Sequence, residues 1–478
     1  GPARSTVAAS DPGVSSQNRE VLRRLLRRGA AAAAAADAER LALEEGASAA
    51  MLRVLAGESR ETRHRASADR SILCVDDTHR LLSLPLREGR WKVTQWNRFG
   101  RRERVGSAWP ATAKTEKKYD AAAVRYPPTR AAAEMALAAA AARTPPGAPV
   151  WIYGARVEGV FGAARDFDRS DRDLKPVVSR SLFRDVSVVF ASACGAFGVV
   201  AATRAEPEDP EDGKDGDGFA LDGVARFRSV TKLVLPLSNG AGALSETVEN
   251  WSVYPGLFAG GGLDVMTAFL LRAMPDRFET PQSRIDRPDA KRRTPFAVLD
   301  YCAGSGVLAA AVRRRVPDDA ALTLTDADAV ALRAARENFA ALGRGVTLCA
   351  SDGFSGLAPG ETFDLIVSNP PVHLGLQPEF TVLRALVREC VSRLNPANPS
   401  ASVWFVAQRY VPVASICADA DVDATCARAD DRFAAWRVAR SQGGGEARSS
   451  GKQKKATEEK KAKKAKKEKK RGSKWAEA

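Results

Sequence analysis

The residues with the most specific chemistry in the sequence are Asn369, Pro370 and Pro371, which follow an apolar run of strand length at 363–367. Each proline lacks a backbone N–H and fixes its own φ angle, so these residues predict a stiff, extended turn at the carboxyl end of a strand. The side-chain carbonyl of Asn369 and the backbone carbonyl of Pro370 would then be two rigid acceptors. Such a pair can hold both hydrogens of an –NH₂ group and align its nitrogen with an electrophile. A proline-stiffened loop without chemistry is the alternative.

A glycine-containing loop, with Gly304 and Gly306, lies between a predicted strand and a predicted helix. Glycines there let a ligand approach the backbone, and a helix N-terminus offers free N–H groups. Asp326 ends the next predicted strand, where an acid commonly binds a ribose diol. The loop alone does not separate NAD from S-adenosylmethionine, and a purely structural turn is a third interpretation.

Three further features favour S-adenosylmethionine. Asp300 precedes the glycines, where it can meet the methionyl amine or a bridging water, and Asp352 follows the third strand, where it can accept from an adenine amino group. The turn at Asn369 ends the next strand. These residues place four strand ends around one crevice at the carboxyl edge of a sheet, where ligands of such sheets bind. A hydride-transfer enzyme would not need a rigid clamp for an amine.

The elements that must position these residues alternate between strand and helix, which predicts an α/β fold with a doubly wound, Rossmann-like sheet. Its strands are expected at 297–299, 321–325, 346–349, 364–368, 401–406, 423–428 and 434–438, and its helices at 265–272, 307–315, 327–342 and 381–394. The earlier half, from about residue 70, is also mixed α/β but has no complete glycine loop. Its strands are expected at 71–75, 91–95, 150–153, 188–190 and 232–235, and a helix at 131–142.

Composition excludes several functional classes. The 478 residues, 45% of them hydrophobic, suffice for two or three domains, and no apolar run reaches membrane-spanning length. Seven scattered cysteines without a Cys-x-x-Cys pair indicate a reducing compartment and argue against disulfides and zinc. With only three histidines, a His-based metal site is not expected.

Charge is concentrated at the end of the chain. The net charge is +15, and residues 441–478 hold 14 Lys/Arg against 5 Asp/Glu. This tail is expected to be disordered, either as a nucleic-acid contact or nuclear-targeting signal or as a solubility tail. Residues 1–65 are Ala- and Arg-rich, as in transit peptides and in other low-complexity tails, and 18–55 could be helical. An acidic run near 205–218 is expected to be a solvated insertion.

Residues 254–440 resemble a class I S-adenosylmethionine-dependent methyltransferase of the methyltransferase small domain group, through Asp300, Gly304, Gly306, Asp326 and the run from Asn369. The most similar family is that of ribosomal RNA small subunit methyltransferase C, which methylates guanine N2. The earlier half resembles that family's degenerate, cofactor-free methyltransferase-like domain, most visibly at 150–159. The implied domains are an N-terminal extension (1–65), a degenerate methyltransferase-like domain (66–245), a catalytic domain (246–440) and a Lys-rich tail (441–478).

The resemblance implies two groups of site residues. The catalytic residues are Asn369, Pro370, Pro371 and His373, and the cofactor-binding residues are Phe258, Asp264, Asp300, Cys302, Gly304, Gly306, Asp326, Asp352 and Asn369. His373 is expected to brace the loop rather than touch the base. The sequence departs from the family at Cys302, where glycine is usual, at Val372, where an aromatic residue stands against the target base, and at 260–261, where a Ser-Arg pair is usual.

The implied function is transfer of a methyl group from S-adenosylmethionine to guanine N2 of small-subunit ribosomal RNA, in ribosome biogenesis. The target base must be flipped out or single-stranded. A monomer acting on ribosomal RNA or a small-subunit precursor is expected, with no metal and no membrane. Alternatives are another amine (large-subunit guanine N2, adenine N6 or a protein glutamine) and a non-catalytic RNA-binding assembly factor. An intracellular reducing compartment is expected, with plastid, mitochondrion and nucleus or nucleolus all open.

Overall fold

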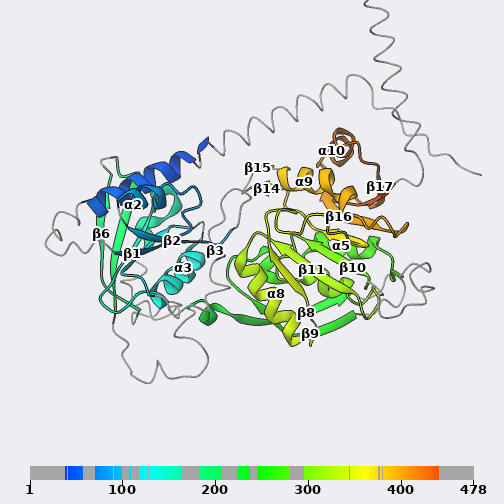
Figure 1. Cartoon of the computed structure of the whole chain (residues 1–478), viewed down its shortest axis with the longest axis horizontal. Coiled ribbons are helices and arrows are strands. Elements are labelled where there is room, and N and C mark those ends of the chain that lie inside the picture. Colours follow the sequence, from blue (N-terminus) through cyan, green and yellow to red (C-terminus); the bar gives the residue numbers. More distant parts are fainter. Residues whose placement is uncertain are drawn as a thin grey trace, which may run out of the picture.

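The computed structural model describes most of the two α/β halves. The described residues are 38–56, 70–99, 107–108, 118–163, 182–205, 223–236, 245–279, 295–374, 377–378 and 380–440, without positions 40, 90, 128, 193 and 344. The targeting-like residues 1–37, most of the acidic insertion near 205–218 and the tail at 441–478 therefore lie outside the described residues. Figure 1 shows the first half in blue to green on one side and the second half in green to orange on the other.

The second half is a seven-stranded sheet in the order β12-β11-β10-β13-β16-β18-β17. Its strands are β10 (Ala297–Tyr301), β11 (Ala321–Asp326), β12 (Thr347–Ala350), β13 (Leu365–Ser368), β16 (Ser402–Gln408), β17 (Ala424–Ala429) and β18 (Phe433–Ala439). The first five of these along the chain run parallel, and β18 pairs antiparallel with both β16 and β17. The predicted doubly wound sheet is confirmed.

Helices cover both faces of this sheet because alternate strand residues point to opposite sides. On β13, Leu365 and Val367 face one core and Ile366 faces the other. The first core is covered by α5 (Val265–Ala273), α7 (Val307–Val312) and α8 (Ala329–Ala341), and the second by α9 (Thr381–Cys390) and α10 (Val413–Asp419). None of the described helices is long and apolar enough to cross a membrane.

The first half repeats the same strand order, β3-β2-β1-β4-β5-β7-β6. Its strands are β1 (Ser71–Val75), β2 (Lys92–Asn97), β3 (Ser107–Ala108), β4 (Ala121–Arg125), β5 (Pro149–Ala155), β6 (Phe183–Ala191) and β7 (Phe197–Arg204). In both halves the residue after the first strand has a left-handed backbone, with φ 60° at Asp76 and 63° at Cys302. The methyltransferase-like α/β domain expected before the catalytic domain is thus confirmed as a fold.

Helices also cover the first sheet on both faces. A helix at 41–56 and α2 (Ser83–Glu88) pack on one face. On the other face lies α3 (Arg130–Ala142), an alanine-rich helix whose first turn is capped by the Thr129 side chain. Val330, Ala331 and Ala334 of α8 belong to the same buried cluster as α3, so the two halves share part of one core.

Two features differ from the sequence expectations. The strands β3, β4 and β7 were not expected, and neither was β9 (Ser245–Val253). The alanine-rich run Ala121–Arg125 of β4 favours helix by intrinsic propensity and forms a strand here through burial between β1 and β5. The hairpin of β8 (Ser229–Pro236) and β9 (Ser245–Val253) straddles the expected domain boundary at 245/246. Leu233 and Leu235 of β8 pack into the core of the second half.

Candidate functional site

A cavity of about 520 Å³ opens at the carboxyl edge of the second sheet. Its walls come from the ends of β10, β11, β12 and β13, as the strand-end argument predicts. Eight of the predicted site residues line it, namely Phe258, Cys302, Gly304, Asp326, Asp352, Asn369, Pro370 and Pro371. Thr267, Gln408 and Phe99 also line it and were not predicted from the sequence.

The two glycines of the loop after β10 have different reasons to be glycine. Gly304 has φ 57°, and a Cβ atom there would meet nothing within 4 Å, so a ligand can approach its backbone. Gly306 has φ 90°, and a Cβ atom there would lie 2.8 Å from the ring of Phe339. Gly306 does not line the cavity; it lets the start of α7 pack closely against α8.

Asp326 is the last residue of β11, and its carboxylate accepts hydrogen bonds from two backbone N–H groups. Its Oδ2 accepts from Gly304 N at 2.8 Å and its Oδ1 from Asp328 N at 2.8 Å. Burial, with the charge of the neighbouring Asp328 as a smaller cause, raises the pKa of Asp326 to about 6 although these hydrogen bonds oppose the shift. Each carboxylate oxygen keeps a second lone pair, which suits donors such as the hydroxyls of a ribose.

Asp300 does not line the cavity, in contrast to its expected cofactor contact. Its side chain is 1% exposed, and its Oδ2 accepts from Ala309 N at 2.9 Å, which ties β10 to α7. Burial, with Asp326 as a smaller cause, raises the pKa of Asp300 to about 8. This carboxyl group can act on a cationic ligand through space once it ionises, but not by direct contact in this conformation.

Cys302 lines the cavity with its thiol protonated. Burial raises the pKa of Cys302 well above its usual value, and the charges of Asp326, Asp300 and Asp352 raise it further. A thiol held neutral in this way is neither a nucleophile nor a metal ligand. Among the described residues, no group of three or more His, Cys, Asp or Glu side chains could hold a metal ion.

Asn369 follows β13 with its amide group held in one orientation. Its Nδ2 lies 3.1 Å from Asp264 Oδ2 and 3.0 Å from Thr267 Oγ1, and both contacts belong to the start of α5. Because both acceptors take the amide nitrogen, the carbonyl oxygen of Asn369 is the side-chain atom left to face the cavity, beside Pro370. The orientation of the Asn369 amide is therefore fixed by the start of α5 as well as by the chain turn at Pro370.

Asp264 has a different role from the cofactor contact predicted for it. It caps α5, where its Oδ2 accepts from Met266 N at 2.8 Å and from Thr267 N at 3.3 Å, and it does not line the cavity. The same carboxylate oxygen accepts from Asn369. The Asp-x-x-Thr spacing at a predicted helix start could have placed Asp264 and Thr267 together, but nothing in the sequence connects them to Asn369, 105 positions away from Asp264.

Phe258 and His373 are the remaining predicted residues. Phe258 lines the cavity and is 67% exposed, so its ring is available to a second ligand. Val372, where the family has an aromatic residue, borders the cavity but is buried in the core under α9. His373 begins the short strand β14 (His373–Leu374), and its side chain is outside the described part of the structure.

The segment at 258–264 is joined to the glycine loop through Gly261. The carbonyl oxygen of Gly261 accepts from Ser305 Oγ at 2.7 Å and from Trp251 Nε1 at 2.8 Å. A Cβ atom at Gly261 would lie 2.6 Å from Val253, whereas one at Gly260 would meet nothing within 4 Å. Glycine at 261, where the family has another residue type, is thus required by local packing.

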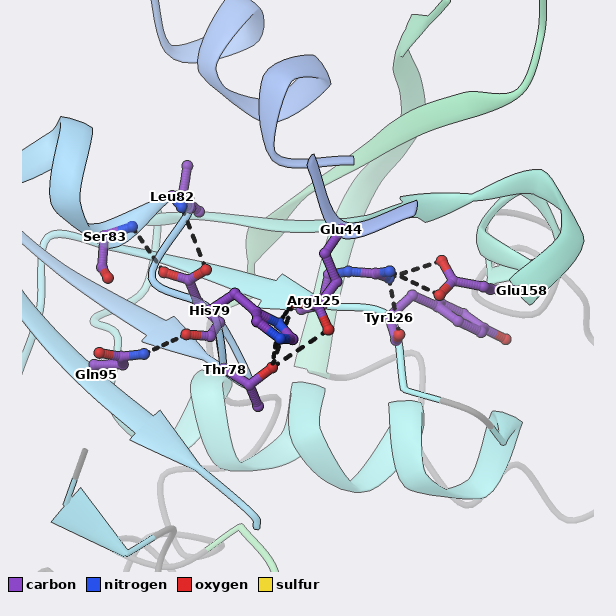
Figure 2. A network of polar contacts seen from close by, with 10 residues as sticks. Glu44, Thr78, His79, Leu82, Ser83, Gln95, Arg125, Tyr126 and Glu158 are labelled. Carbon is purple, nitrogen blue, oxygen red and sulfur yellow. Dashed lines mark hydrogen bonds and ion pairs between the residues drawn. The ribbon is translucent and has the colours of Figure 1, made fainter. Parts of the chain in front are cut away.

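The corresponding strand ends of the first sheet carry a different set of residues. By the registers Val75↔Val124 and Tyr301↔Ser368, the residue that corresponds to Asn369 is Arg125. Figure 2 shows Arg125 in a two-pronged ion pair with Glu158, at 2.7 and 2.8 Å. The figure also shows the neighbouring contacts of His79 with Glu44 and Thr78. Close by, the Asp77 carboxylate accepts from the backbone N–H groups of Leu82 and Ser83.

These side chains at the strand ends of the first sheet form hydrogen bonds and ion pairs within the protein. The residues that correspond to the glycine loop are Asp77, Thr78, His79 and Arg80. The features that make a cavity in the second half, an open glycine and an amide facing inward, have no counterpart there.

Comparison with known proteins finds a family model that is similar to the second half. Residues 250–435 match the methyltransferase small domain family. Ribosomal RNA small subunit methyltransferase C of Hahella chejuensis is 33% identical over 158 residues, which are 33% of this chain and 40% of that protein. The protein of the same name from Pseudomonas entomophila is 29% identical over 319 residues, 66% of this chain and 77% of that protein.

A solved structure shares the fold over both halves. A T. thermophilus 16S rRNA N2 methyltransferase, in complex with AdoMet and guanosine, covers 78% of this chain, and 88% of its own length is matched. The TM-score is 0.55 at 19% sequence identity, so this likeness concerns the fold.

Proposed function

We propose that this chain, whose residues 250–435 form a methyltransferase small domain, transfers a methyl group from S-adenosylmethionine to guanine N2 of small-subunit ribosomal RNA. The observation that carries the proposal is the fixed amide of Asn369, whose nitrogen is bound by Asp264 and Thr267 and which lines the cavity beside Pro370. Similar proteins named ribosomal RNA small subunit methyltransferase C support the choice of substrate.

The residues present fit S-adenosylmethionine. Asp326 would accept from the ribose hydroxyls, Asp352 from the adenine amino group, and the open backbone at Gly304 would lie against the methionyl end. When bound, this cofactor supplies a methyl group on a positively charged sulfur, which is already an activated electrophile. The chain therefore needs no nucleophile, in agreement with the neutral thiol of Cys302.

The role of the protein in the transfer is to position the amine and to stabilise charge. The oxygens of Asn369 and Pro370 would accept the two hydrogens of guanine N2, which holds its lone pair on the transfer line. As the nitrogen takes the methyl group it becomes cationic, and the same two oxygens stabilise that charge before a proton leaves to solvent. Alignment of this kind can contribute about 7–11 kcal/mol to lowering a barrier.

The target base reaches the cavity only after it leaves its helix, since a stacked base cannot be surrounded by Asn369, Pro370 and Pro371. The exposed ring of Phe258 at the rim is placed to stack on such a base or on its neighbour. The proposed enzyme acts on ribosomal RNA as a monomer that carries both halves. Its seven free cysteines suit a reducing compartment.

The test combines cofactor binding with product identification. The full chain should bind S-adenosylmethionine in calorimetry, and it should place a labelled methyl group on small-subunit RNA taken from cells that lack the modification. Mass spectrometry of the nucleosides should show N2-methylguanosine. Label in N6-methyladenosine, in large-subunit RNA or in protein glutamine would replace the proposed substrate, and absence of cofactor binding would favour a non-catalytic RNA-binding factor.

Asn369→Ala tests whether the Asn369 side chain holds the amine of the substrate. It should keep cofactor affinity within a factor of about three and should lower the rate of transfer at least 100-fold, since it removes only the group that holds the amine. Equal losses of binding and transfer would contradict the role given to Asn369.

A further inference from the structure

One wall of the cavity in the second half is supplied by the first half. Phe99 lies just after β2, lines the cavity, and is 48% exposed. It forms an isolated antiparallel bridge with Asp328, which stands two residues after Asp326 at the start of α8. Phe99 therefore sits at the end of the cavity where Asp326 would bind a ribose, on the side away from Asn369 along the strand order.

Arg98 anchors this wall. Its guanidinium donates to both carboxylate oxygens of Asp328, at 3.0 and 2.9 Å, and to Pro255 O at 3.3 Å. Its backbone N donates to Asp76 Oδ1 at 2.7 Å, and its backbone O accepts from Ala329 N at 2.9 Å. Arg98 is 5% exposed. The backbone and the side chain of one residue thus join the first sheet to the start of α8.

The ion pair of Arg98 and Asp328 fixes how the two halves are arranged more than it adds to the free energy of unfolding. A buried pair contributes little net stability over apolar residues, whereas the loss of one partner leaves an uncompensated buried charge. The contact therefore holds the two halves in one arrangement. The guanidinium of Arg98 also lies 5.3 Å from the centre of the Phe99 ring, a cation–π distance that restrains the ring.

The contacts continue from this wall to the ribose acceptor. Asp328 N donates to Asp326 Oδ1, and Asp328 Oδ1 accepts from Val330 N at 2.9 Å as the cap of α8. A displacement of Arg98 would thus move both Phe99 and the turn that holds Asp326.

We propose that the first half completes the cofactor site: Phe99 covers the nucleoside end of bound S-adenosylmethionine, and the Arg98–Asp328 pair couples the docking of the two halves to cofactor affinity. This inference rests on the proposed function for the identity of the ligand. Adenine presents a flat apolar face, and an aromatic side chain restrained beside it provides contact area with little loss of conformational freedom. The degenerate half then has a task in catalysis although it has no cofactor of its own.

Calorimetry with the full chain and S-adenosylhomocysteine tests the contact of Phe99. Phe99→Ala should weaken binding about 10-fold, Phe99→Tyr should restore it, and adenosine but not methionine should share the loss. Leu84→Ala is the matched control, because Leu84 is a 50% exposed apolar side chain of the same half that does not line the cavity. If wild type binds and Phe99→Ala binds as tightly, the inference is refuted; if wild type does not bind, the proposed function fails instead.

Arg98→Met tests the coupling. The variant should weaken S-adenosylhomocysteine binding about 10-fold, and Phe99→Ala in that background should cost clearly less than it does in wild type, because the ring has already lost its restraint. Unchanged affinity of Arg98→Met, or fully additive losses in the double variant, would overturn the coupling. Circular dichroism and thermal unfolding of each variant separate lost affinity from lost fold, and Phe99→Ala still tests the contact if Arg98→Met does not fold.

Discussion

Replacing Asp264 by serine should slow methyl transfer while it leaves cofactor affinity and the stability of α5 nearly unchanged. Serine is as good a helix cap as aspartate, so the donors at Met266 and Thr267 keep an acceptor. The shorter, neutral side chain loses the contact with Asn369 Nδ2, which Asp264 holds at 3.1 Å. The amide of Asn369 would then be restrained by Thr267 alone.

The size of the effect follows from the two bonds that fix the amide. A hydrogen bond to a charged group contributes about 1.5–3 kcal/mol and one between neutral groups about 0.5–1.5 kcal/mol. Each 1.36 kcal/mol of lost preference for the productive orientation is about a tenfold loss in rate. Asp264→Ser should therefore lower the rate of transfer about 10- to 150-fold, and Thr267→Val about 2- to 10-fold.

The assay is single-turnover transfer from labelled S-adenosylmethionine to small-subunit RNA, with cofactor affinity measured by calorimetry and fold stability by thermal unfolding. Thr347→Val, on the exposed edge strand β12, is the matched control for Thr267→Val and should leave all three quantities unchanged. The reasoning would be refuted if Asp264→Ser transferred at the wild-type rate, or if its loss of rate were matched by an equal loss of cofactor affinity.

Three further outcomes are expected. The folded pKa values of Asp326 and Asp300, about 6 and about 8, exceed the ordinary value of 3.8, so the folded state binds more protons than the unfolded state. The free energy of unfolding should therefore fall as pH rises from about 4 to about 8. Asp300→Asn should flatten the upper part of that fall, as measured by urea titrations. Asp326→Ala should weaken cofactor binding more than 10-fold in calorimetry, with adenosine binding equally affected. Gly306→Ala should cost about 1–3 kcal/mol of unfolding free energy because of its φ of 90° and the Phe339 ring. Gly304→Ala, where only the φ of 57° is unfavourable, should cost less stability but should also lower cofactor affinity; a larger loss of stability than in Gly306→Ala together with unchanged affinity would contradict the distinct roles of the two glycines.

The pattern of residues along the chain was enough to predict the fold class and the position of the site. Strand–helix alternation dictates a parallel sheet, and the carboxyl ends of its strands meet at one edge, so Asp326, Asp352 and Asn369 could be brought together without coordinates. The local chemistry of the proline turn and the glycine loop was equally readable, since it depends on neighbours in the chain. The missed strands, β4 among them, show the limit of this approach, because burial between neighbouring strands overrides alanine's preference for helix.

How the site is completed depends on contacts that form only in the folded molecule. The carboxylate of Asp264 accepts from Asn369 rather than contacting a cofactor. The carboxylate of Asp300 accepts from the backbone of α7 and so holds β10 to that helix. Arg98 and Asp328 are 230 residues apart, in halves that each form their own sheet. No periodicity or motif encodes such pairs, because their meeting depends on how two folded surfaces dock and on which buried groups then find partners.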